Sequence, residues 1–196
     1  MKILMTGATS DVGRVVFGHI ASQHEVACIS RSTGFDLTFP ESNLEYIVQD
    51  YDVFINLANI NYFQGDALYQ VYDIFEKQQT NIPKKIISFG SLVTELPMRI
   101  IVDSNGSYYN RSREQSEYIG QKLYLEKVHN ECVQRHLAGY SNEYVMPQSI
   151  LLKLGNVFEK KERSHEPYTT EKQLLEVVDA ALMGTNYIPT VEVRWN

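Results

Sequence analysis

The stretch Lys2-Ile-Leu-Met-Thr-Gly-Ala-Thr-Ser-Asp-Val-Gly13 joins a short apolar segment to a turn that carries glycine at both ends. Lys2–Met5 is typical of a short buried strand, and the residues from Arg14 to Ala21 follow a helical period. A strand, a glycine-bearing turn and a helix in this order are the context that a dinucleotide-binding fingerprint requires. A plain strand-turn-helix unit without a ligand is the alternative, and this stretch alone leaves both open.

The glycines of the turn have separate expected roles. Gly7 would allow the tight turn, and Gly13 would let the helix pack close to the strand. The free amides at the start of the helix would then face a pyrophosphate. The middle glycine that is usual in such loops is absent, and Ser10 or Asp11 stands there, depending on the alignment.

The end of the second expected strand, Glu25–Ser30, lies where the adenosine ribose of a dinucleotide would bind. An acidic residue there would bind the 2′-hydroxyl, whereas an arginine such as Arg31 suits a 2′-phosphate. Arg31 therefore favours NADP over NAD, with a solvated loop residue as the alternative. The link that follows is too short for a full crossover helix, and a short strand at residues 35–37 would put Asp36 near the adenine.

Strand-like and helix-like segments alternate along the rest of the chain. We expect strands at residues 52–58, 85–90, 149–155 and 188–193, helices at 40–48, 65–79, 111–137 and 171–183, and a polar loop at 160–170. This alternation predicts an α/β fold, a Rossmann-type doubly wound parallel sheet with helices on both faces. The sequence has no repeat, low-complexity tract or linker, so residues 1–196 are expected to form a single domain.

Two strand ends carry further candidate residues. Asn56-Leu-Ala-Asn59 comes at the end of one expected strand, and Ser91 follows another directly. The carboxyl ends of strands form the ligand-binding edge of an open α/β sheet. The small side chain of Ala58 would let the ribose next to nicotinamide approach. Ser91 is well placed to bond a substrate oxygen, although a cap or turn role is more common for such a serine.

The helix at residues 111–137 contains Tyr118-Ile-Gly-Gln-Lys122. Residues four apart share a helix face, so Tyr118 and Lys122 are expected to lie one above the other. A phenol with a pKa near 10 is a poor acid or base at neutral pH, and a neighbouring ammonium group lowers that pKa. The pair is therefore a candidate for moving a proton to or from a hydroxyl or carbonyl. An ordinary helix with a buried tyrosine and a solvated lysine is the alternative.

Composition excludes several classes of function. The net charge of −6 argues against a nucleic-acid groove or an anionic membrane surface as partner. We expect no signal peptide and no transmembrane span, since no long apolar run is present. Cys28 and Cys132, the two cysteines, form no disulfide framework, which favours a reducing, cytoplasmic location.

One potential metal-binding pattern occurs on the long helix. His129, Cys132 and His136 fall on one helix face, but no Cys-x-x-Cys or His-x-x-x-His pattern is nearby. A buried or interface stripe is the preferred interpretation, and no metal is expected.

Taken together, these motifs resemble the short-chain dehydrogenase/reductase family, and more narrowly its extended branch of NAD(P)-dependent sugar epimerases, dehydratases and reductases. The matching pieces occur in the family's order over nearly the whole chain: Thr6-Gly7…Gly13, Asp36-Leu37, Asn56-Leu-Ala58, Ser88-Phe-Gly-Ser91, Tyr118-x-x-x-Lys122-Leu-x-x-Glu126 and Leu152-Lys-Leu-Gly-Asn-Val157. The chain differs from that branch in lacking the middle glycine and a large carboxyl-terminal substrate domain. The substrate pocket is therefore expected to come from residues 92–110, residues 160–170 and a partner subunit.

The resemblance implies roles for particular residues. Tyr118 would be the catalytic acid/base, Lys122 would bind the nicotinamide ribose and lower the tyrosine pKa, and Ser91, rather than Ser88, would hold the substrate oxygen. The implied cofactor-binding residues are Gly7, Ser10, Asp11, Val12 and Gly13 at the pyrophosphate, Arg31 and Ser32 at the 2′-phosphate, Asp36 and Leu37 at the adenine, and Leu57, Ala58, Asn59 and Lys122 near the nicotinamide ribose.

The predicted function is thus an NADP(H)-dependent oxidoreductase or epimerase-type enzyme acting on a carbonyl or hydroxyl of a small polar, sugar-like substrate. The alternative is a dinucleotide-binding regulatory or scaffold protein without turnover. A homodimer built on helices 65–79 and 111–138 is expected, because these correspond to the helices that pair in many relatives and two-fold dimers are the commonest assembly.

Overall fold

The computed structural model describes residues 1–30, 33–35, 44–95, 101–102, 108–109, 113–139, 144–157, 168–184 and 186–193. Its centre is a six-stranded parallel sheet with the strand order β10-β7-β4-β3-β1-β2. These strands are β1 (Lys2–Thr6), β2 (Glu25–Ile29), β3 (Val53–Asn56), β4 (Lys85–Ser91), β7 (Gln148–Leu154) and β10 (Thr190–Val193). The predicted Rossmann-type α/β fold is confirmed.

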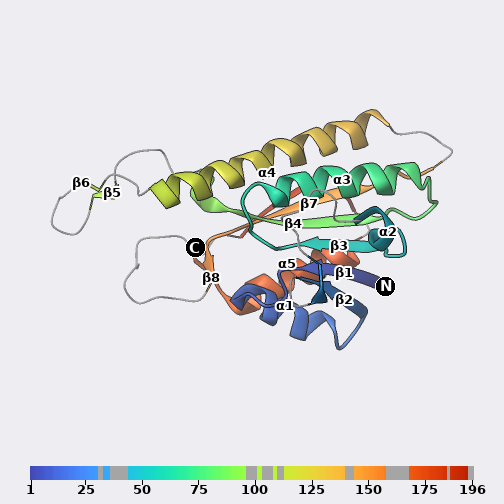
Figure 1. Ribbon diagram of the computed structural model, residues 1–196, viewed down its shortest axis with the longest axis horizontal. Helices are drawn as coiled ribbons and strands as arrows, with labels where there is room; N and C mark the ends of the chain where they lie inside the picture. The colour runs from blue at the N-terminus through green and yellow to red at the C-terminus, as the bar shows by residue number, and fades with distance from the viewer. Residues whose placement is uncertain are drawn as a thin grey trace.

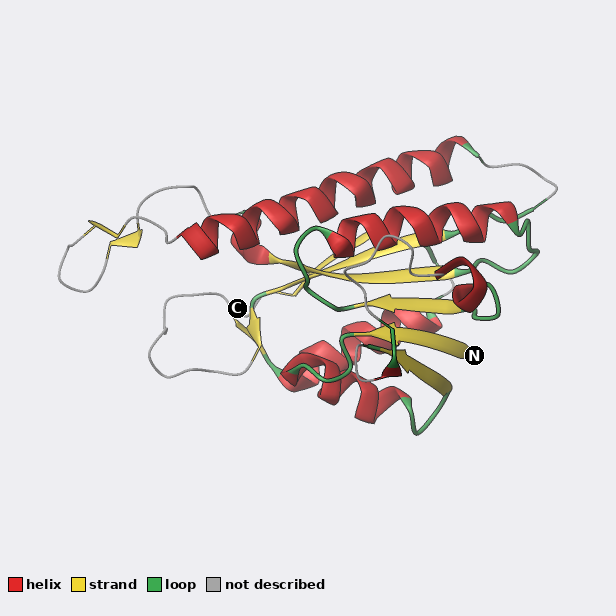
Figure 2. Ribbon diagram, in the orientation of Figure 1, coloured by secondary structure: helices red, strands yellow, loops and turns green. Residues whose placement is uncertain are grey.

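Helices cover both faces of the sheet, as Figures 1 and 2 show. Helices α1 (Asp11–Ile20) and α5 (Glu171–Met183) lie together on one face. Helices α2 (Leu44–Val48), α3 (Phe63–Lys77) and α4 (Arg113–Ala138) cover the other face, with α3 and α4 side by side. The molecule is therefore a three-layer sandwich with the sheet in the middle.

The core follows from the apolar character of the strands. Ile3 and Met5 pack toward α1 and α5, whereas Leu4 between them packs toward α3 and α4. Side chains alternate between the two faces of a strand, so a strand covered on both faces must be apolar throughout. Strand β3 follows this rule at Val53–Ile55, which are apolar and buried, whereas β7 is also buried throughout but includes the polar residues Gln148, Ser149 and Lys153.

Polar side chains join the helices in each outer layer. Arg135 of α4 forms ion pairs with Asp73 (2.7 Å) and Glu76 of α3 and lies over the ring of Tyr72. On the opposite face, His19 of α1 contacts Asp179 of α5 at 2.7 Å. These contacts set the position of each helix against its neighbour.

The order in which the chain adds strands to the sheet reverses at β1. From β1 the chain passes to β2 on one side and then to β3 on the other, so β1 lies between them. Such a reversal opens a crevice at the carboxyl ends of the strands, where open α/β sheets bind ligands. The sequence candidates at Gly7 and Asn56–Asn59 lie at this edge.

The expected elements agree with the structure to within a few residues, with some differences. Phe35 is not in a strand, and the rest of the strand expected at residues 35–37 lies outside the described residues. The structure also contains two short strand pairs that the sequence did not indicate: β5 (Ile101–Val102) with β6 (Tyr108–Tyr109), and β8 (Asn156–Val157) with β9 (Tyr168–Thr169). The expectation of an unbroken loop over residues 160–170 was therefore wrong at its end.

Within the described residues, none of the helices combines the length and the apolar character needed to cross a membrane.

Candidate active site

The ends of β1 and β3 are joined by a buried threonine. The Thr6 hydroxyl accepts hydrogen bonds from the backbone amides of Leu57 and Ala58, both at 3.1 Å. Gly7 follows with φ +75°, and a Cβ atom there would lie 2.7 Å from the Ala58 nitrogen. Only glycine combines this backbone conformation with so close an approach. The two strand ends are therefore held together at the carboxyl edge of the sheet.

Helix α1 begins against this wall. A Cβ atom on Gly13 would lie 2.0 Å from the Gly7 carbonyl oxygen, so glycine is required for the close contact between helix and turn. Both glycines thus take the positions that the fingerprint predicts.

Ser10 occupies the N-cap of α1, where the family's middle glycine was expected. Its hydroxyl donates to the Gly7 carbonyl (2.9 Å) and accepts from the Gly13 amide (3.0 Å). No described residue accepts a hydrogen bond from the amides of Asp11 or Val12, so these donors face outward from the helix start. The Asp11 carboxylate pairs with Arg14 at 2.8 Å on the exposed side.

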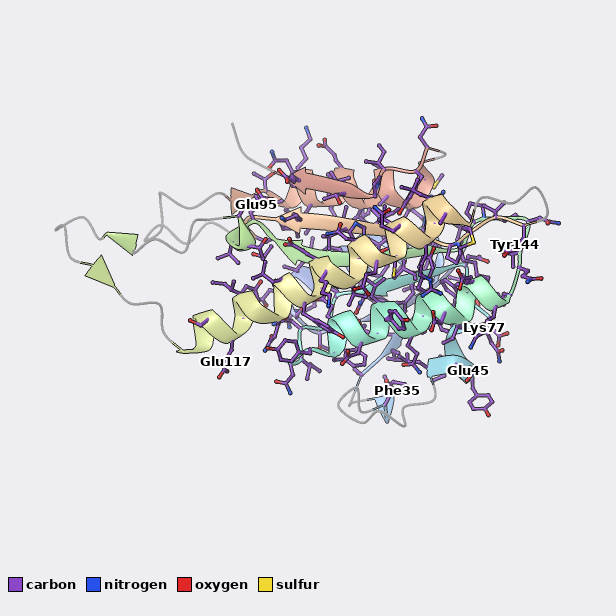
Figure 3. All side chains as sticks on the ribbon, turned by 90° about the horizontal axis from the view of Figure 1, so that it is seen from above. Phe35, Glu45, Lys77, Glu95, Glu117 and Tyr144 are labelled. Carbon is purple, nitrogen blue, oxygen red and sulfur yellow. The ribbon has the colours of Figure 1, made fainter. Side chains whose placement is uncertain are left out.

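Ser91 and Tyr118 meet at the same edge of the sheet. Ser91 ends β4 and caps the short 3₁₀ helix η2 (Leu92–Thr94), and its side chain is hydrogen-bonded to the Tyr118 hydroxyl. In Figure 3, Glu95, just after η2, and Glu117, beside Tyr118, mark the same end of the molecule. Tyr118 as a whole residue remains 37% exposed.

The pKa of Tyr118 lies above its ordinary value. Burial raises this pKa, and the hydrogen bond from Ser91 lowers it by a smaller amount. Burial and the Ser91 hydrogen bond account for this net rise, and Lys122 is not among its causes, so the expected lowering of the tyrosine pKa by Lys122 stays a prediction. The hydroxyl is therefore protonated at neutral pH and acts as a donor.

Lys122 lies one helical turn from Tyr118, and 4% of it is exposed. Its Nζ donates to Gln64 Oε1 at 2.7 Å and to the Phe89 carbonyl at 2.8 Å, and lies 5.6 Å from the centroid of the Tyr118 ring. Burial lowers the pKa of Lys122 to about 8. The solvated lysine of the alternative interpretation is thus excluded, because this ammonium group is buried and held by neutral acceptors.

Asn56 and Gln64 belong to the same buried network, and the sequence analysis did not single out Gln64. The Asn56 side-chain amide donates to the Gln64 carbonyl at 2.6 Å and to the Ser88 hydroxyl at 3.4 Å. Among the described residues, Asn56 Oδ1 has no partner. No sequence signal points to a glutamine in the first turn of a helix, because its role arises only from contacts across the fold. Ser88 is fully buried within β4, whereas Ser91 is partly exposed at the end of the strand.

A second polar network ties Ser91 to α4 and β7. The Thr94 hydroxyl lies 2.8 Å from the Ser91 carbonyl oxygen and 2.5 Å from the Glu126 carboxylate. Lys153 of β7 pairs with Glu126 (3.2 Å) and Glu95 (2.5 Å). Burial lowers the pKa of Lys153, but the bonds to the two carboxylates outweigh it and raise the net value. The sequence analysis gave Glu126 and Lys153 no role, although both lie within the motifs that match the family, and that position was the sequence signal that could have identified them.

The His129, Cys132 and His136 stripe faces the sheet. His129 contacts the hydroxyls of Ser149 (2.8 Å) and Thr190 (3.2 Å), and the His136 Nδ1 atom lies 3.0 Å from the Pro147 carbonyl. The described part of the chain contains no group of three His, Cys, Asp or Glu side chains arranged to hold a metal ion.

The remaining candidates divide into two sets. Leu57 and Ala58 are nearly buried at the edge of the crevice, and Asn59 is exposed there. Arg31, Ser32, Asp36 and Leu37 lie outside the described residues.

Comparison with solved structures identifies similar folds. The sequence itself matches no protein-family model and no curated protein. The chain is similar in structure to yeast methylglyoxal/isovaleraldehyde reductase complexed with NADPH (TM-score 0.71, 11% identity, covering 99% of this chain and 78% of the reductase). It is also similar to UDP-N-acetylglucosamine 4-epimerase from Bacillus cereus (TM-score 0.64, 15% identity, 99% and 78%).

A third similar structure is a short-chain dehydrogenase/reductase superfamily protein from Agrobacterium tumefaciens with bound NAD (TM-score 0.65, 11% identity, covering 99% of this chain and 77% of that protein). Two of these three structures contain a bound nicotinamide dinucleotide, and the chain is shorter than each of the three. The resemblance to the short-chain dehydrogenase/reductase family indicated by the sequence is confirmed in the fold that this chain shares with them.

Proposed function

We propose that this chain binds a nicotinamide dinucleotide, NADP(H) in preference to NAD(H), and uses Ser91, Tyr118 and Lys122 in an oxidoreductase or epimerase-type reaction. The substrate is a small molecule with a carbonyl or hydroxyl group, and sugar-derived substrates are the first class to test. The observation that carries the proposal is the meeting of the Ser91 side chain with the Tyr118 hydroxyl, with the Lys122 ammonium one turn away.

The residues at the crevice fit a dinucleotide. Gly7 and Gly13 allow the closest contacts between β1, β3 and α1, which leaves the outward-facing amides of Asp11 and Val12 for the pyrophosphate. Lys122 uses two of its three donors inside the protein, so one remains for a ribose hydroxyl. The proposed domain assignment follows: residues 1–196 form a dinucleotide-binding domain with a small substrate-binding part or none.

The proposed chemistry divides among three side chains. Bound at this edge, the dinucleotide would supply or accept a hydride. Tyr118, protonated at neutral pH, donates its proton to a substrate carbonyl oxygen or recovers it in the reverse direction. Ser91 orients that oxygen by a hydrogen bond. The Lys122 cation, 5.6 Å from the tyrosine ring, stabilises the phenolate that forms as the proton leaves.

Removing the Tyr118 hydroxyl tests this assignment. The change Tyr118→Phe keeps the ring and should lower turnover by about 10²–10⁴-fold, the usual contribution of a general acid, with NADPH affinity unchanged. Ser91→Ala should reduce the rate through substrate orientation and also leave NADPH affinity unchanged. The matched control is Tyr124→Phe on the same helix, whose hydroxyl bonds to Asp66 at 2.8 Å, away from Ser91.

The assay is the loss of NADPH absorbance over a panel of ketoses, nucleotide-linked deoxysugars and simple carbonyls. A regulatory protein without turnover is the second candidate, favoured by the Ser10 hydroxyl that already binds the Gly13 amide at the cofactor-facing helix start. If the wild type binds NADPH but remains inactive over the whole panel, the enzyme is rejected in favour of the regulator. If it binds neither NADPH nor NADH, both candidates are rejected.

We also propose a homodimer built on α3 and α4. Their outer surface carries an open groove of about 720 Å³, lined by Tyr69, Leu123, Lys127, Glu131 and Arg135 among others. Nearly half of the surface of Tyr69 and of Leu123 is exposed. In a two-fold interface each surface contacts the same surface of a second copy. An apolar centre flanked by both positive and negative side chains suits such an interface, because opposite charges can then pair across it.

A further inference from the structure

The surroundings of Lys122 differ from those of the other cations near the site. Lys153 pairs with the carboxylates of Glu95 and Glu126, whereas Lys122 donates only to a side-chain amide and a backbone carbonyl. Within the described residues, no carboxylate forms an ion pair with Lys122. The positive charge of this buried side chain is therefore uncompensated inside the protein.

The amide of Gln64 can take only one orientation. Its Nε2 donates to the Asn56 carbonyl at 2.7 Å and to the Phe89 carbonyl at 3.2 Å. Its Oε1 must then face the Lys122 ammonium, because a flipped amide would bring N–H groups against the ammonium and oxygen against two carbonyls. Since Gln64 is 3% exposed, water does not offer an alternative partner.

The ionisable groups around Lys122 have other partners. On α4, Glu126 bonds to Thr94 and Lys153, and on α3, Asp66 accepts from Tyr124. Glu95 after η2 pairs with Lys153 of β7. The phenol of Tyr118 also lies beside Lys122, with its ring centroid 5.6 Å from Nζ, and its partner is the neutral side chain of Ser91.

We propose that Gln64 is a positioning residue, which aims the Lys122 ammonium and, because it is neutral, leaves that charge free to act on the Tyr118 phenol. A glutamate of the same shape would hold the ammonium as well but would cancel its field at the tyrosine. Burial without a counter-charge lowers the pKa of Lys122 to about 8, as this arrangement requires. The catalytic meaning of the inference rests on the proposed function, whereas the electrostatic part does not.

The test follows Lys122 and Tyr118 by NMR in the cofactor-free protein, with labelled lysine and tyrosine side chains assigned from Lys122→Met and Tyr118→Phe. The signals are followed as the pH is raised. In Gln64→Glu, the pH at which half of the Lys122 ammonium has lost its proton, its titration midpoint, should rise by about 1–3 pH units, the usual effect of an opposite charge at contact distance. Tyr118 titrates above Lys122, after the wild-type lysine has lost its proton, so its titration midpoint should rise in the same variant because the added carboxylate opposes the phenolate. Gln70→Glu, the same change at an exposed position of α3, is the matched control and should move neither.

A second variant guards against misfolding of the first. Gln64→Met keeps the size but removes the acceptor, so the Lys122 midpoint should fall below that of the wild type. An unchanged Lys122 midpoint in Gln64→Met or in Gln64→Glu would overturn the proposal, as would an equal shift in Gln70→Glu. A merely structural role for Gln64 would change the melting temperature but not these midpoints selectively. Because no cofactor is present, failure of NADPH binding or turnover rejects the proposed function without affecting this result.

Discussion

Lys122→Met should leave the protein as stable as the wild type at pH 7.5, or more stable, although it removes a buried hydrogen-bonded side chain. The ammonium group of Lys122 has a pKa of about 8 instead of its ordinary value of 10.5. Since one pKa unit corresponds to about 1.4 kcal/mol, keeping this group charged in the folded protein costs about 3 kcal/mol.

Replacing Lys122 by methionine removes this cost but also removes a donor. Gln64 Oε1 then has no partner, at a cost of about 1–3 kcal/mol, whereas the Phe89 carbonyl keeps its bond from Gln64 Nε2. The variant should therefore range from equal to the wild type to about 2 kcal/mol more stable at pH 7.5. Such a result would mean that Lys122 is retained for its charge at the expense of stability.

The pH dependence has a defined sign. The folded-state pKa of Lys122 is below the unfolded one, so between about pH 8 and 10.5 the unfolded chain binds more protons and stability rises with pH. The wild type should gain about 2 kcal/mol relative to Lys122→Met between pH 7.5 and pH 10. Lys84 and Lys85, whose pKa values are also lowered by burial, are present in both proteins and cancel in the comparison.

The assay is urea unfolding followed by circular dichroism at both pH values, at one protein concentration. Lys127→Met is the control, since that lysine lies on the same helix with its side chain 73% exposed, and its difference from the wild type should not change with pH. Two results would contradict this reasoning: a free energy of unfolding for Lys122→Met several kcal/mol below that of the wild type at pH 7.5, or a difference between the two proteins that is the same at both pH values. Either would mean that the charge of Lys122 is compensated in the folded protein.

Three further predictions concern the cofactor, a buried histidine and the assembly. Arg31→Ala should weaken NADPH binding by about 1.5–3 kcal/mol and leave NADH binding nearly unchanged, measured by calorimetry; equal affinities of the wild type for both cofactors would contradict it. Burial lowers the pKa of His129 from 6.5 to about 4, so the unfolded chain binds more protons in this range and stability is lost as the pH falls through it. In urea unfolding, the free energy of unfolding of the wild type should therefore fall by about 3 kcal/mol more than that of His129→Gln. Light scattering at micromolar concentration should give the mass of a dimer, and a monomer mass for the wild type would rule out the α3/α4 interface.

The order of strands and helices was predictable from the sequence because it depends on local properties. Continuous apolar runs such as Val53–Ile55 specify strands covered on both faces, and the sequence from Gly7 to Gly13 specifies the turn into α1. The expected helix at residues 171–183 coincides with α5, since Thr170 and Gln173 form a capping box that begins it.

The contacts between distant segments were decided by the tertiary structure alone. Ser91 and Tyr118 come together only because β4 and the start of α4 reach the same edge of the sheet. The spacing of Tyr118 and Lys122 correctly placed both on one helix face, but it did not indicate that the net tyrosine pKa would be raised. The sign of this shift depends on how much water each group loses on folding, and burial is a property of the whole packed structure. For the same reason Gln64, an ordinary residue in the sequence, emerges as the partner of Lys122 only when α3 packs against α4 across the ends of β3 and β4.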